Sequence, residues 1–497
     1  MYTKKERGQE ELFLYCRLTD LIPEEHILKR VHKAVDFSWI REEVRESYCE
    51  YNGRPSIDPE SALRLMLAGL FQGIVHDRKL MREAQVNVAI RWFAGYRLDE
   101  SLPDHSSLTR IRERWGAERF RRIFERTVKS CMDAGLVGGE TVHVDATLIR
   151  ADVSWESVVE KHVEEVLEAN ETEKETAEDE GGDGSPPRRV GGAPKRKKPK
   201  KMSRTDPDAT LTTSSDSFRM EPSYKQHTVV DDEAGVVLDV KVTTGEANEG
   251  KELEGQLDRV EGLTGSKIST VTADRGYSHS RNYKELEKRE VDAIIPPQKR
   301  GRHGKVIPLS RFKYDGRQGI VRCPGGKILR RASRGKNGWL YRGQKSDCGS
   351  CRLRSRCVPS SGRVRSVLIV DGYEALLRAR RRWKRKEPYV REQYGRHRWR
   401  VEGVHGEAKK WHGLGRAMRR GLWNVAVQAY LTAAVLNLKR LVNASCLPER
   451  VSSSFSAFLA HFMDWLTASV EWDRPSTDKT DFSPGPTEIV ESLVSVS

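Results

Sequence analysis

The sequence predicts an α/β protein with an all-helical N-terminal region, and two observations carry that prediction. Apolar residues between positions 22 and 136 recur at steps of three and four, which is the period of amphipathic helices. From Thr141 onward, β-prone runs alternate with helical runs, beginning with the strand-like stretch TVHVDATLI at residues 141–149. A chain of 497 residues is long enough to divide into two or three domains with substantial cores.

The N-terminal helices carry clear start and stop signals. Asp58 precedes a proline, which is the pattern of an N-cap followed by the first helical turn. The apolar stripe from Leu63 to Phe71 ends near a glycine, and a second stripe from Phe120 to Cys131 does the same. Stripes of this kind usually form the core of a helix bundle, so we assign residues 1–136 to a helical N-terminal domain.

The elements of the following domain, residues 137–445, can be placed in order. Strict alternation of apolar residues over Val236 to Val242, after the β-prone run that starts at Tyr224, predicts a hairpin. The further elements expected along this domain are a helix near Leu253 to Val260, a strand at Ile268 to Ala273, a strand at residues 365–371 and helices from Ala375 to Leu441.

Two insertions and a tail interrupt or follow this domain. Residues 153–203 join an acidic run to a run rich in Pro, Gly, Lys and Arg, which lacks the apolar content of a core, so we predict a disordered charged insertion. One helix over Val158 to Leu167 is conceivable within it. Residues 299–363 form a second insertion that bears cysteines, and residues 446–497 form a C-terminal tail that we expect to be mobile.

The charge of the chain indicates its partner. Lysine and arginine outnumber aspartate and glutamate by 88 to 72, a formal net charge of +16, which favours nucleic acid. Six arginines between positions 110 and 122 would follow a phosphate backbone if they shared one face, and we expect the helical N-terminal domain, residues 1–136, to bind DNA. No apolar run reaches the roughly 18 residues of a spanning helix, and the N-terminus has no apolar signal core, so we expect a cytoplasmic protein without membrane association.

Three acids stand where their surroundings make them conspicuous. Asp145 lies inside the first predicted strand among apolar residues, where a lone carboxylate is costly to bury without a partner. Asp274 ends a later strand, and Gly276 beyond it allows the backbone to turn sharply. Glu402 stands in a predicted helix among arginines and lysines. Each acid alone also fits a structural role, as a turn residue or a salt-bridge partner.

Together, the three carboxylates fit a two-metal site. In such sites metal ions about 3.5 to 4 Å apart activate the attacking oxygen and stabilise the leaving one. Hard oxygen ligands favour Mg²⁺ or Mn²⁺ over zinc. We therefore predict that Asp145, Asp274 and Glu402 bind Mg²⁺ or Mn²⁺.

These motifs resemble a known family. HVDAT, TADRGY and an Arg-x3-Glu-x6-Lys run are similar to the motifs of DDE transposases of bacterial insertion sequences. The segments PSIDPESALRLMLAGLFQGI and RWFAGYRLDESLPDHSSLTRIRERW resemble the helical N-terminal domain of that family. The resemblance covers most of the chain. It implies a ribonuclease H-like mixed sheet with helices on both faces, with Asp145, Asp274 and Glu402 as catalytic acids.

The same resemblance implies DNA contacts around the third acid. Arg398 lies four residues before Glu402 and Lys409 lies seven residues after it, as the family pattern requires for cations that hold DNA-end phosphates. The family tyrosine would fall at Gly395, whereas the aromatic residue available is Tyr394. The further candidates for DNA contact in this stretch are Tyr394, Arg396 and Arg400.

The function implied by the resemblance is a cut-and-paste transposase acting on double-stranded DNA. Metal-activated water cleaves DNA at the element's ends, and the freed 3′ hydroxyl then attacks target DNA at the same site. Because two ends must be processed together, we expect a homodimer in the DNA complex, associated with the nucleoid. Two alternatives stay open: a ribonuclease H-like nuclease that only hydrolyses DNA, and a non-catalytic DNA-binding protein derived from a transposase.

The cysteines and two histidines need separate interpretations. Eight cysteines in so long a chain do not form a dense disulfide framework. Two interpretations of a four-cysteine cluster stay open, a structural Zn²⁺ in a small zinc ribbon and four reduced, unligated thiols. His105 and His143 are expected to be structural, because no hydrolase motif accompanies them. The clustered cysteines are Cys323, Cys348, Cys351 and Cys357.

Overall fold

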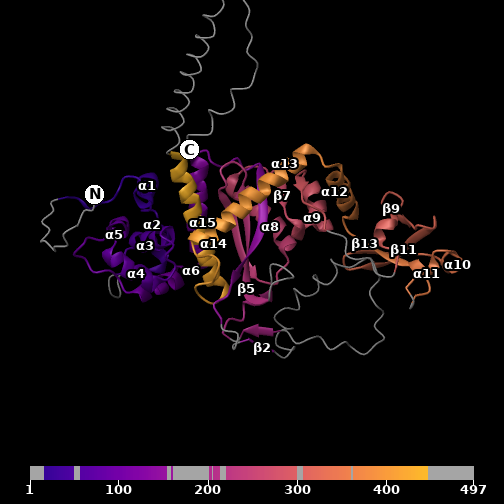
Figure 1. Ribbon diagram of the computed structural model, residues 1–497, viewed down its shortest axis with the longest axis horizontal. Helices are drawn as coiled ribbons and strands as arrows, with labels where there is room; N and C mark the ends of the chain where they lie inside the picture. The colour runs from indigo at the N-terminus through magenta and orange to yellow at the C-terminus, as the bar shows by residue number, and fades with distance from the viewer. Residues whose placement is uncertain are drawn as a thin grey trace, which may run out of the picture. The chain divides into compact units, whose positions relative to one another are not determined.

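The computed structural model describes residues 16–49, 56–153, 158–160, 201–203, 205–212, 220–298, 306–359 and 362–445. Residues up to Val442 belong to one compact unit and the remainder to a second (Figure 1). The predicted tail at 446–497 lies outside the described residues, and so do residues 161–200 of the predicted charged insertion.

The N-terminal region is helical, as predicted. The Asp58 side chain caps α3 by accepting a hydrogen bond from the backbone N–H of Ser61, and Pro59 occupies the first turn. Gly116, at φ +71°, divides α6 into two segments by adopting a conformation that favours glycine. The helices are α1 (Ile27–Ala34), α2 (Ile40–Glu43), α3 (Pro59–Phe71), α4 (Asp77–Val86), α5 (Val88–Ala94) and α6 (His105–Asp133), with 3-10 turns at Leu18–Leu21 and Arg45–Ser47.

The central sheet is mixed. β5 pairs antiparallel with β1 and with β6, whereas β1, β7 and β8 run parallel to one another. The order β6-β5-β1-β7-β8, with antiparallel strands on one side and parallel strands on the other, is the ribonuclease H-like arrangement expected from the resemblance. The strands are β1 (Thr141–Arg150), β5 (Glu221–Asp231), β6 (Val237–Thr244), β7 (Thr270–Ala273) and β8 (Asp292–Ile294).

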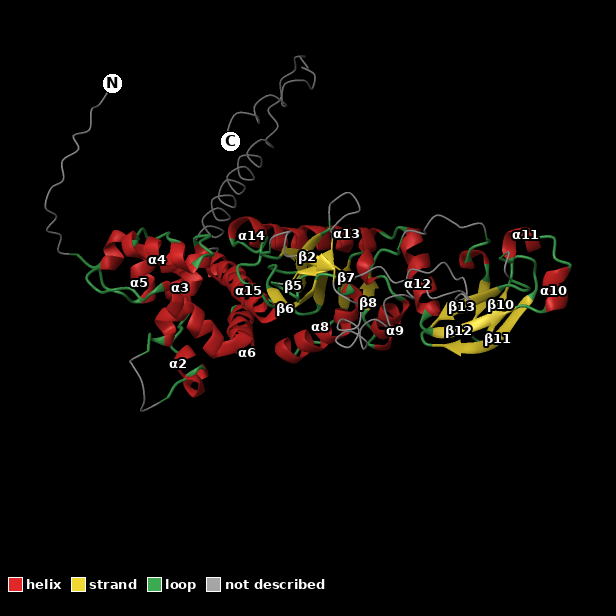
Figure 2. Ribbon diagram, turned by 90° about the horizontal axis from the view of Figure 1, so that it is seen from below, coloured by secondary structure: helices red, strands yellow, loops and turns green. Residues whose placement is uncertain are grey.

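Helices cover both faces of this sheet. Figure 2 shows α13 and α14 along one face and α8 and α9 along the other. Strand β5 is buried at nearly every position, because its side chains meet packed elements on both sides. The helices of this region are α8 (Glu249–Thr264), α9 (Ser280–Lys288), α12 (Tyr373–Arg385), α13 (Pro388–His397), α14 (Gly403–Trp411) and α15 (Leu422–Ser445).

A second, antiparallel sheet lies in the chain between β8 and α12. Its order is β13-β12-β11-β10-β9. The strand expected at residues 365–371 is present as β13, but it pairs with β12 and so extends the cysteine-bearing insertion. Strand propensity alone does not specify the partner strand, which is why the sequence left this open. The strands are β9 (Lys313–Asp315), β10 (Ile320–Arg322), β11 (Ile328–Gly335), β12 (Gly338–Arg342) and β13 (Ser366–Val370), with the short helices α10 (Lys345–Gly349) and α11 (Arg354–Cys357).

The charged insertion contains strands at both of its ends. β2 (Val158–Glu160) and β3 (Lys201–Ser203) pair antiparallel, and β3 continues the sheet through β4 (Thr210–Thr212) to β5. These six residues are therefore not disordered, and the first three of the conceivable helix are a strand. Backbone hydrogen bonds to an available sheet edge need no apolar side chains, so composition did not reveal this pairing.

The C-terminal helix α15 closes the fold. Residues 412–421 interrupt the long helical stretch that was predicted. At Leu422–Ala444 the helix is long and apolar enough to cross a membrane, but 89% of that window is buried within the fold, as in a core helix. Asn437, fully buried, accepts a hydrogen bond from the Val237 N–H at 2.8 Å and donates one to the Val237 carbonyl at 2.9 Å. It thereby pairs with the first residue of β6.

Candidate active site

Asp145 lies within β1 and Asp274 directly follows β7, at the point where the parallel pairing of these two strands ends. β1 and β7 run parallel, and the last residues they pair are Val144 and Ala273. Asp145 and Asp274 are the next residue on each strand, so the sheet brings the two carboxylates together. Asp274 Oδ1 accepts a hydrogen bond from the Gly276 N–H at 2.7 Å, which orients that side chain.

Glu402 reaches this end of the sheet from a π-helical turn. The turn spans Arg398–Glu402 and joins α13 to α14. Single π-turns inside α-helices are rare and are frequent at functional sites. The Glu402 side chain is 65% exposed, and Oε1 accepts a hydrogen bond from Arg398 Nε at 3.3 Å. Its carboxylate is thus free to turn towards a cation.

Two buried histidines hold the π-turn against the sheet. His397, just before the turn, bonds through Nδ1 to Thr272 Oγ1 at 3.0 Å. Thr272 is two residues before Asp274 on β7, so this contact fixes the start of the turn beside the second acid. Burial lowers the pKa of His397 to about 3, and the histidine is neutral.

The second histidine fixes the other end of the turn. His405 Nε2 lies 3.1 Å from Thr228 Oγ1, and Thr228 pairs directly with Asp145 across β1 and β5. His405 Nδ1 is also 3.7 Å from Asp145 Oδ2. Burial lowers the pKa of His405 to about 3. Neither histidine was singled out from the sequence, where the available signal was only their position on either side of Glu402.

The acids of this site repel one another. Burial raises the pKa of Asp145 to about 8, and the charges of Asp274, Glu249 and Glu402 add to the shift while the Ala146 N–H opposes it. Burial and the charge of Glu249 also raise the pKa of Asp274. A divalent cation would relieve both burial and repulsion, so the donor set fits a hard metal ion.

The described side chains are not in a coordinating arrangement as they stand. Within the described ranges, no three His, Cys, Asp or Glu side chains are placed so that they could hold a metal ion. Of the predicted ligands, Glu402 is the one engaged elsewhere, because it pairs with Arg398. The fold therefore positions the backbone of the site, and binding of a cation would draw in the third carboxylate.

Three of the predicted DNA contacts line the same region. Arg398 is 67% exposed beside Glu402. Partial burial and the charge of Arg150 lower the pKa of Lys409, whereas the charge of Asp145 raises it. The Tyr394 ring stacks on His397 with centroids 5.6 Å apart. Burial, followed by the charge of Asp274, raises the pKa of Tyr394.

The other two predicted contacts already have protein partners. Arg396 Nη2 lies 2.6 Å from Asp232 Oδ2. Arg400 donates a hydrogen bond to the carbonyl of Glu233 and packs over the Trp399 ring. Both cations therefore brace the π-turn against the loop between β5 and β6.

His143 is a packed residue. It is fully buried, with Nδ1 2.6 Å from Thr272 Oγ1 and Nε2 2.9 Å from Asp232 Oδ1. Its ring packs against His397 with centroids 5.9 Å apart. His105 is the first residue of α6, and its Nδ1 is 3.1 Å from Asp104 Oδ2. The structure thus gives both histidines structural neighbours.

None of the four clustered cysteines forms a disulfide, and two of them lie close together. A methyl group at Gly325 would lie 3.4 Å from Cys351 Sγ and 3.7 Å from Cys323 Sγ, so both sulfurs face that glycine. Backbone N–H groups point at the same two sulfurs, from Lys327 at 3.3 Å and Leu353 at 3.4 Å. Burial raises the pKa of the Cys357 thiol, and the charges of the other three cysteines add to it.

The arginines at positions 110–122 do not form one free face. Most of them have partners within the protein, so the expectation that they share a phosphate-tracking surface is wrong for them. Helical spacing does not show which side chains meet acids on other helices. The contacts are Arg112 with Asp77, Arg114 over the Tyr48 ring, Arg119 with Glu46, Arg121 with Glu125 and Arg122 with Glu43.

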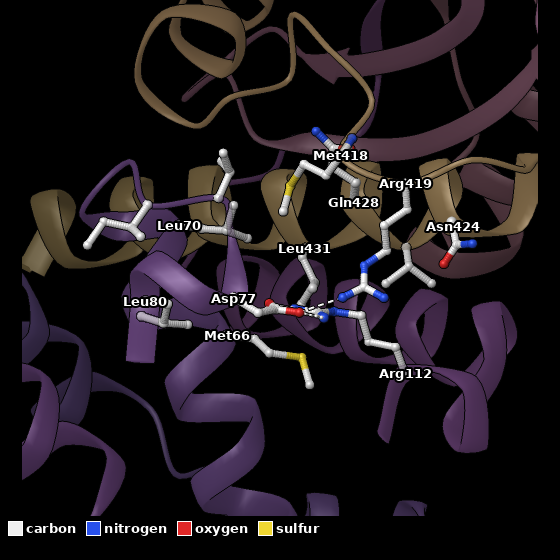
Figure 3. Close-up of a pocket in the computed structure, with 13 residues that line it drawn as sticks. Met66, Leu70, Asp77, Leu80, Arg112, Met418, Arg419, Asn424, Gln428 and Leu431 are labelled. Atoms are coloured by element: carbon white, nitrogen blue, oxygen red, sulfur yellow. Dashed lines mark hydrogen bonds and ion pairs between the residues drawn. The ribbon is translucent and has the colours of Figure 1, made fainter. Parts of the chain in front are cut away.

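Asp77 joins the helical region to the segment that follows α14. Arg112 binds both of its oxygens at 2.7 Å, and Arg419 binds Oδ2 (Figure 3). Arg419 also donates a hydrogen bond to Thr109 Oγ1. Met66, with other apolar side chains, lines the small cavity beside them. Burial opposes ionisation of Asp77, but the two guanidinium groups outweigh it and lower its pKa.

Comparison with known proteins identifies the family. The family model described as Transposase domain (DUF772) matches residues 16–114, and the one described as Transposase DDE domain matches residues 199–438. The chain belongs to the DDE transposases. It is therefore a DNA transposase, an enzyme that acts on DNA with a divalent metal ion.

Comparisons with curated proteins and with solved structures add little information about this transposase. No curated protein matches it. Among solved structures, a piggyBac transposase synaptic complex with hairpin DNA matches over 86% of this chain and 73% of its own, at 12% identity and a TM-score of 0.29, which carries no structural argument. Asp274 and Glu402 fall inside the matched DDE region, whereas Asp145 lies outside both matched regions. The evidence that Asp145 belongs to the site is therefore its position beside Asp274.

Proposed function

We propose that Asp145, Asp274 and Glu402 are the catalytic acids of this transposase and bind Mg²⁺ or Mn²⁺. The observation that carries the proposal is the parallel register of β1 and β7, which puts Asp145 and Asp274 side by side, together with the π-turn that bears Glu402. Bound divalent ions would polarise the scissile phosphate and activate the attacking oxygen.

The reaction consists of two displacements at phosphorus. In cleavage, a water oxygen bonds to the phosphorus while the bond to the 3′ oxygen breaks, which leaves a 3′ hydroxyl at the element's end and a 5′ phosphate on the flanking DNA. In strand transfer, that 3′ oxygen bonds to a target phosphorus and the target's own 3′ oxygen leaves. His397 and His405 are buried and hold the π-turn through threonines of the sheet, so we give them a positioning role.

Phosphate contacts are proposed for Arg398 and Lys409, which flank the acids. Tyr394 would add a stacking surface beside them. Arg396 and Arg400 remain predicted contacts that would have to exchange their present partners. Two ends must be held together during the reaction, so we propose a homodimer in the DNA complex, located in the cytoplasm with the nucleoid.

A second basic surface supports DNA binding by the N-terminal region. A hollow of about 490 Å³ opens over the start of α4. Lys79 and Arg82 are exposed there, and neither has an ion-pair partner among the residues that the structure describes. Unpaired cations around a concave surface suit a phosphate backbone. The other arginines around the hollow are Arg78 and Arg419, and His76 and His105 also line it.

A structural Zn²⁺ is proposed for the four-cysteine cluster. Four thiolates close a tetrahedral coordination sphere, which leaves no open position for water and so gives the metal a structural role. The N–H groups directed at two of the sulfurs support this, because such bonds stabilise thiolates.

The test of the main proposal is a strand-transfer assay. Purified full-length protein is incubated with Mg²⁺, labelled DNA that carries the element's ends, and a supercoiled target. A transposase yields target DNA joined to the labelled 3′ end. Cleavage of the ends with no joined product at any metal concentration would favour the nuclease alternative, and intact DNA under all conditions would favour the non-catalytic one. No present observation favours either.

A further inference from the structure

A fourth carboxylate stands at the proposed metal site. Glu249 lies in the first turn of α8, directly after Asn248, which caps the helix. A methyl group on Gly276 would overlap Glu249 Oε2 and would lie 2.9 Å from Asp274 Oδ1. The two carboxylate oxygens therefore lie close to the same point beside Gly276.

A salt bridge with Lys225 engages one carboxylate oxygen of Glu249 and leaves the other oxygen without this partner. Lys225 Nζ is 3.1 Å from Glu249 Oε1 and also donates to the Ala247 carbonyl at 2.8 Å. Glu249 Oε2 is the atom turned towards Asp274. A purely structural ion pair would require neither this orientation nor the proximity to a buried acid, since both raise the electrostatic cost.

A buried hydroxyl points to the same place. Tyr277 is fully buried, and its hydroxyl has no hydrogen-bond partner among the described residues. The nearest charges acting on it are Asp145, Glu249 and Asp274. A buried hydroxyl without a hydrogen-bond partner is unfavourable, and a bound ligand with its own water shell would satisfy it. The hydroxyl is thus an independent sign that something polar binds between these acids.

We propose that Glu249 is a further ligand of the divalent cation, together with Asp145 and Asp274. It approaches from the helix layer opposite the one that carries Glu402, so the cation would be held from both faces of the sheet (Figure 2). Lys225 then balances the negative charge of Glu249 while no cation is bound, and the Tyr277 hydroxyl supplies a hydrogen bond when the cation is bound. This inference rests on the proposed function of Asp145 and Asp274.

The chain offers a matched control for Glu249. Glu252 lies three residues further along the same helix and also pairs with a lysine, with Lys241 Nζ 2.5 Å from its Oε2. It carries the same charge and the same kind of ion pair, but no contact with Asp274. A difference between Glu249→Gln and Glu252→Gln therefore reports on the cation and not on loss of a surface salt bridge.

The experiment measures Mn²⁺ binding to the full-length protein without DNA, by electron paramagnetic resonance and by calorimetry. Glu249→Gln should weaken Mn²⁺ binding about tenfold or more, as loss of a group that orients a metal site does, and Glu252→Gln should leave it unchanged. Lys225→Met should strengthen binding, because it frees the Glu249 carboxylate. This variant keeps the test decisive if Glu249→Gln folds poorly.

Two results would overturn the inference, and they differ in scope. Wild-type Mn²⁺ affinity in both Glu249→Gln and Lys225→Met, with affinity lost in Asp274→Asn, refutes the role of Glu249 and leaves the proposed active site standing. Wild-type affinity in Asp274→Asn as well removes the proposed site together with the inference.

Discussion

The carboxylate site and the cysteine cluster are built in opposite ways. The three acids are more than 100 residues apart along the chain, yet paired strands and two buried histidines hold their backbones together. The four cysteines fall within one short stretch, in a sheet whose longest strand, β11, is exposed at six of its eight positions. The first site is organised by the fold, whereas the second has little core of its own. We therefore propose that a metal ion would serve chemistry in the first and structure in the second.

The largest expected effect tests the first half of this comparison. Asp145→Asn, Asp274→Asn and Glu402→Gln should each reduce DNA cleavage at least about a thousandfold, because a lost metal ligand removes several kcal/mol of transition-state stabilisation. The thermal midpoint of the metal-free protein should not fall. Gel assays with end-bearing DNA and calorimetry measure the two quantities. Near wild-type cleavage by one variant would exclude that residue from the site.

The buried acid Asp77 offers a contrast with the carboxylate site, because the protein's own arginines balance its charge. Asp77→Asn should destabilise the protein by about 3 to 5 kcal/mol at neutral pH, because it leaves two guanidinium groups without their acid. The pKa of Asp77 is lowered in the fold, so its contribution is present above the unfolded pKa of about 3.9 and disappears as the pH falls through the folded value. Urea unfolding at pH 7 and below pH 4 should show the difference from wild type shrinking. A constant difference would contradict this account.

The cysteine cluster should lose structure when its metal is removed, whereas the carboxylate site should keep its fold. Chelation, or Cys351→Ser, should release about one zinc per chain and make the second sheet sensitive to protease, since a structural zinc contributes folding energy. Cys49→Ser is the control, because that thiol is exposed and outside the cluster. Metal analysis and limited proteolysis follow the change. An unaltered digestion pattern after Cys351→Ser would return these residues to free thiols.

A smaller effect is expected for the cations beside the acids. Arg398→Ala and Lys409→Ala should each lower the slope of log binding constant against log salt by about one, because each removes a phosphate contact. Lys267→Ala, which breaks an exposed pair with Glu290, is a matched loss of one positive charge. Filter binding from low to moderate salt gives the slopes. Equal slopes for all three variants would argue against specific phosphate contacts.

The smallest effect is expected from shortening the charged insertion. Deletion of residues 161–200 should leave the thermal midpoint of the protein nearly unchanged, because their composition cannot contribute to a core. The strands β2 and β3 are retained so that the sheet edge stays intact. Differential scanning calorimetry provides the measurement. A drop of several degrees would show that these residues pack.

Local signals in the sequence were sufficient for much of this fold. Asp58 and its proline marked a helix start, and the alternation from Val236 marked a strand. The strand-end setting of Asp145 and Asp274 indicated that they would meet. Each of these inferences depends on neighbours within a few residues, which is the range over which periodicity and capping act.

What the sequence did not reveal depends on distant partners. His397 finds Thr272 across 125 positions, and Glu249 meets Asp274 only after a helix has folded onto the sheet. From the sequence Arg112 was a candidate for DNA contact, but in the structure it pairs with Asp77 on another helix. Such pairings are set by tertiary packing, which a single sequence does not encode in its spacing.

The buried Asn437 has a consequence for how the chain is made. Both polar backbone groups of Val237, at the start of β6, depend on a side chain that the ribosome adds 200 residues later. The same amide lies 3.4 Å from Thr127 Oγ1, on the last helix of the N-terminal region. A nascent chain therefore cannot complete these contacts of its central sheet until Asn437 has been translated. A copy of the gene with a stop codon before position 437 would yield an incompletely folded polypeptide and not a shortened competitor for DNA.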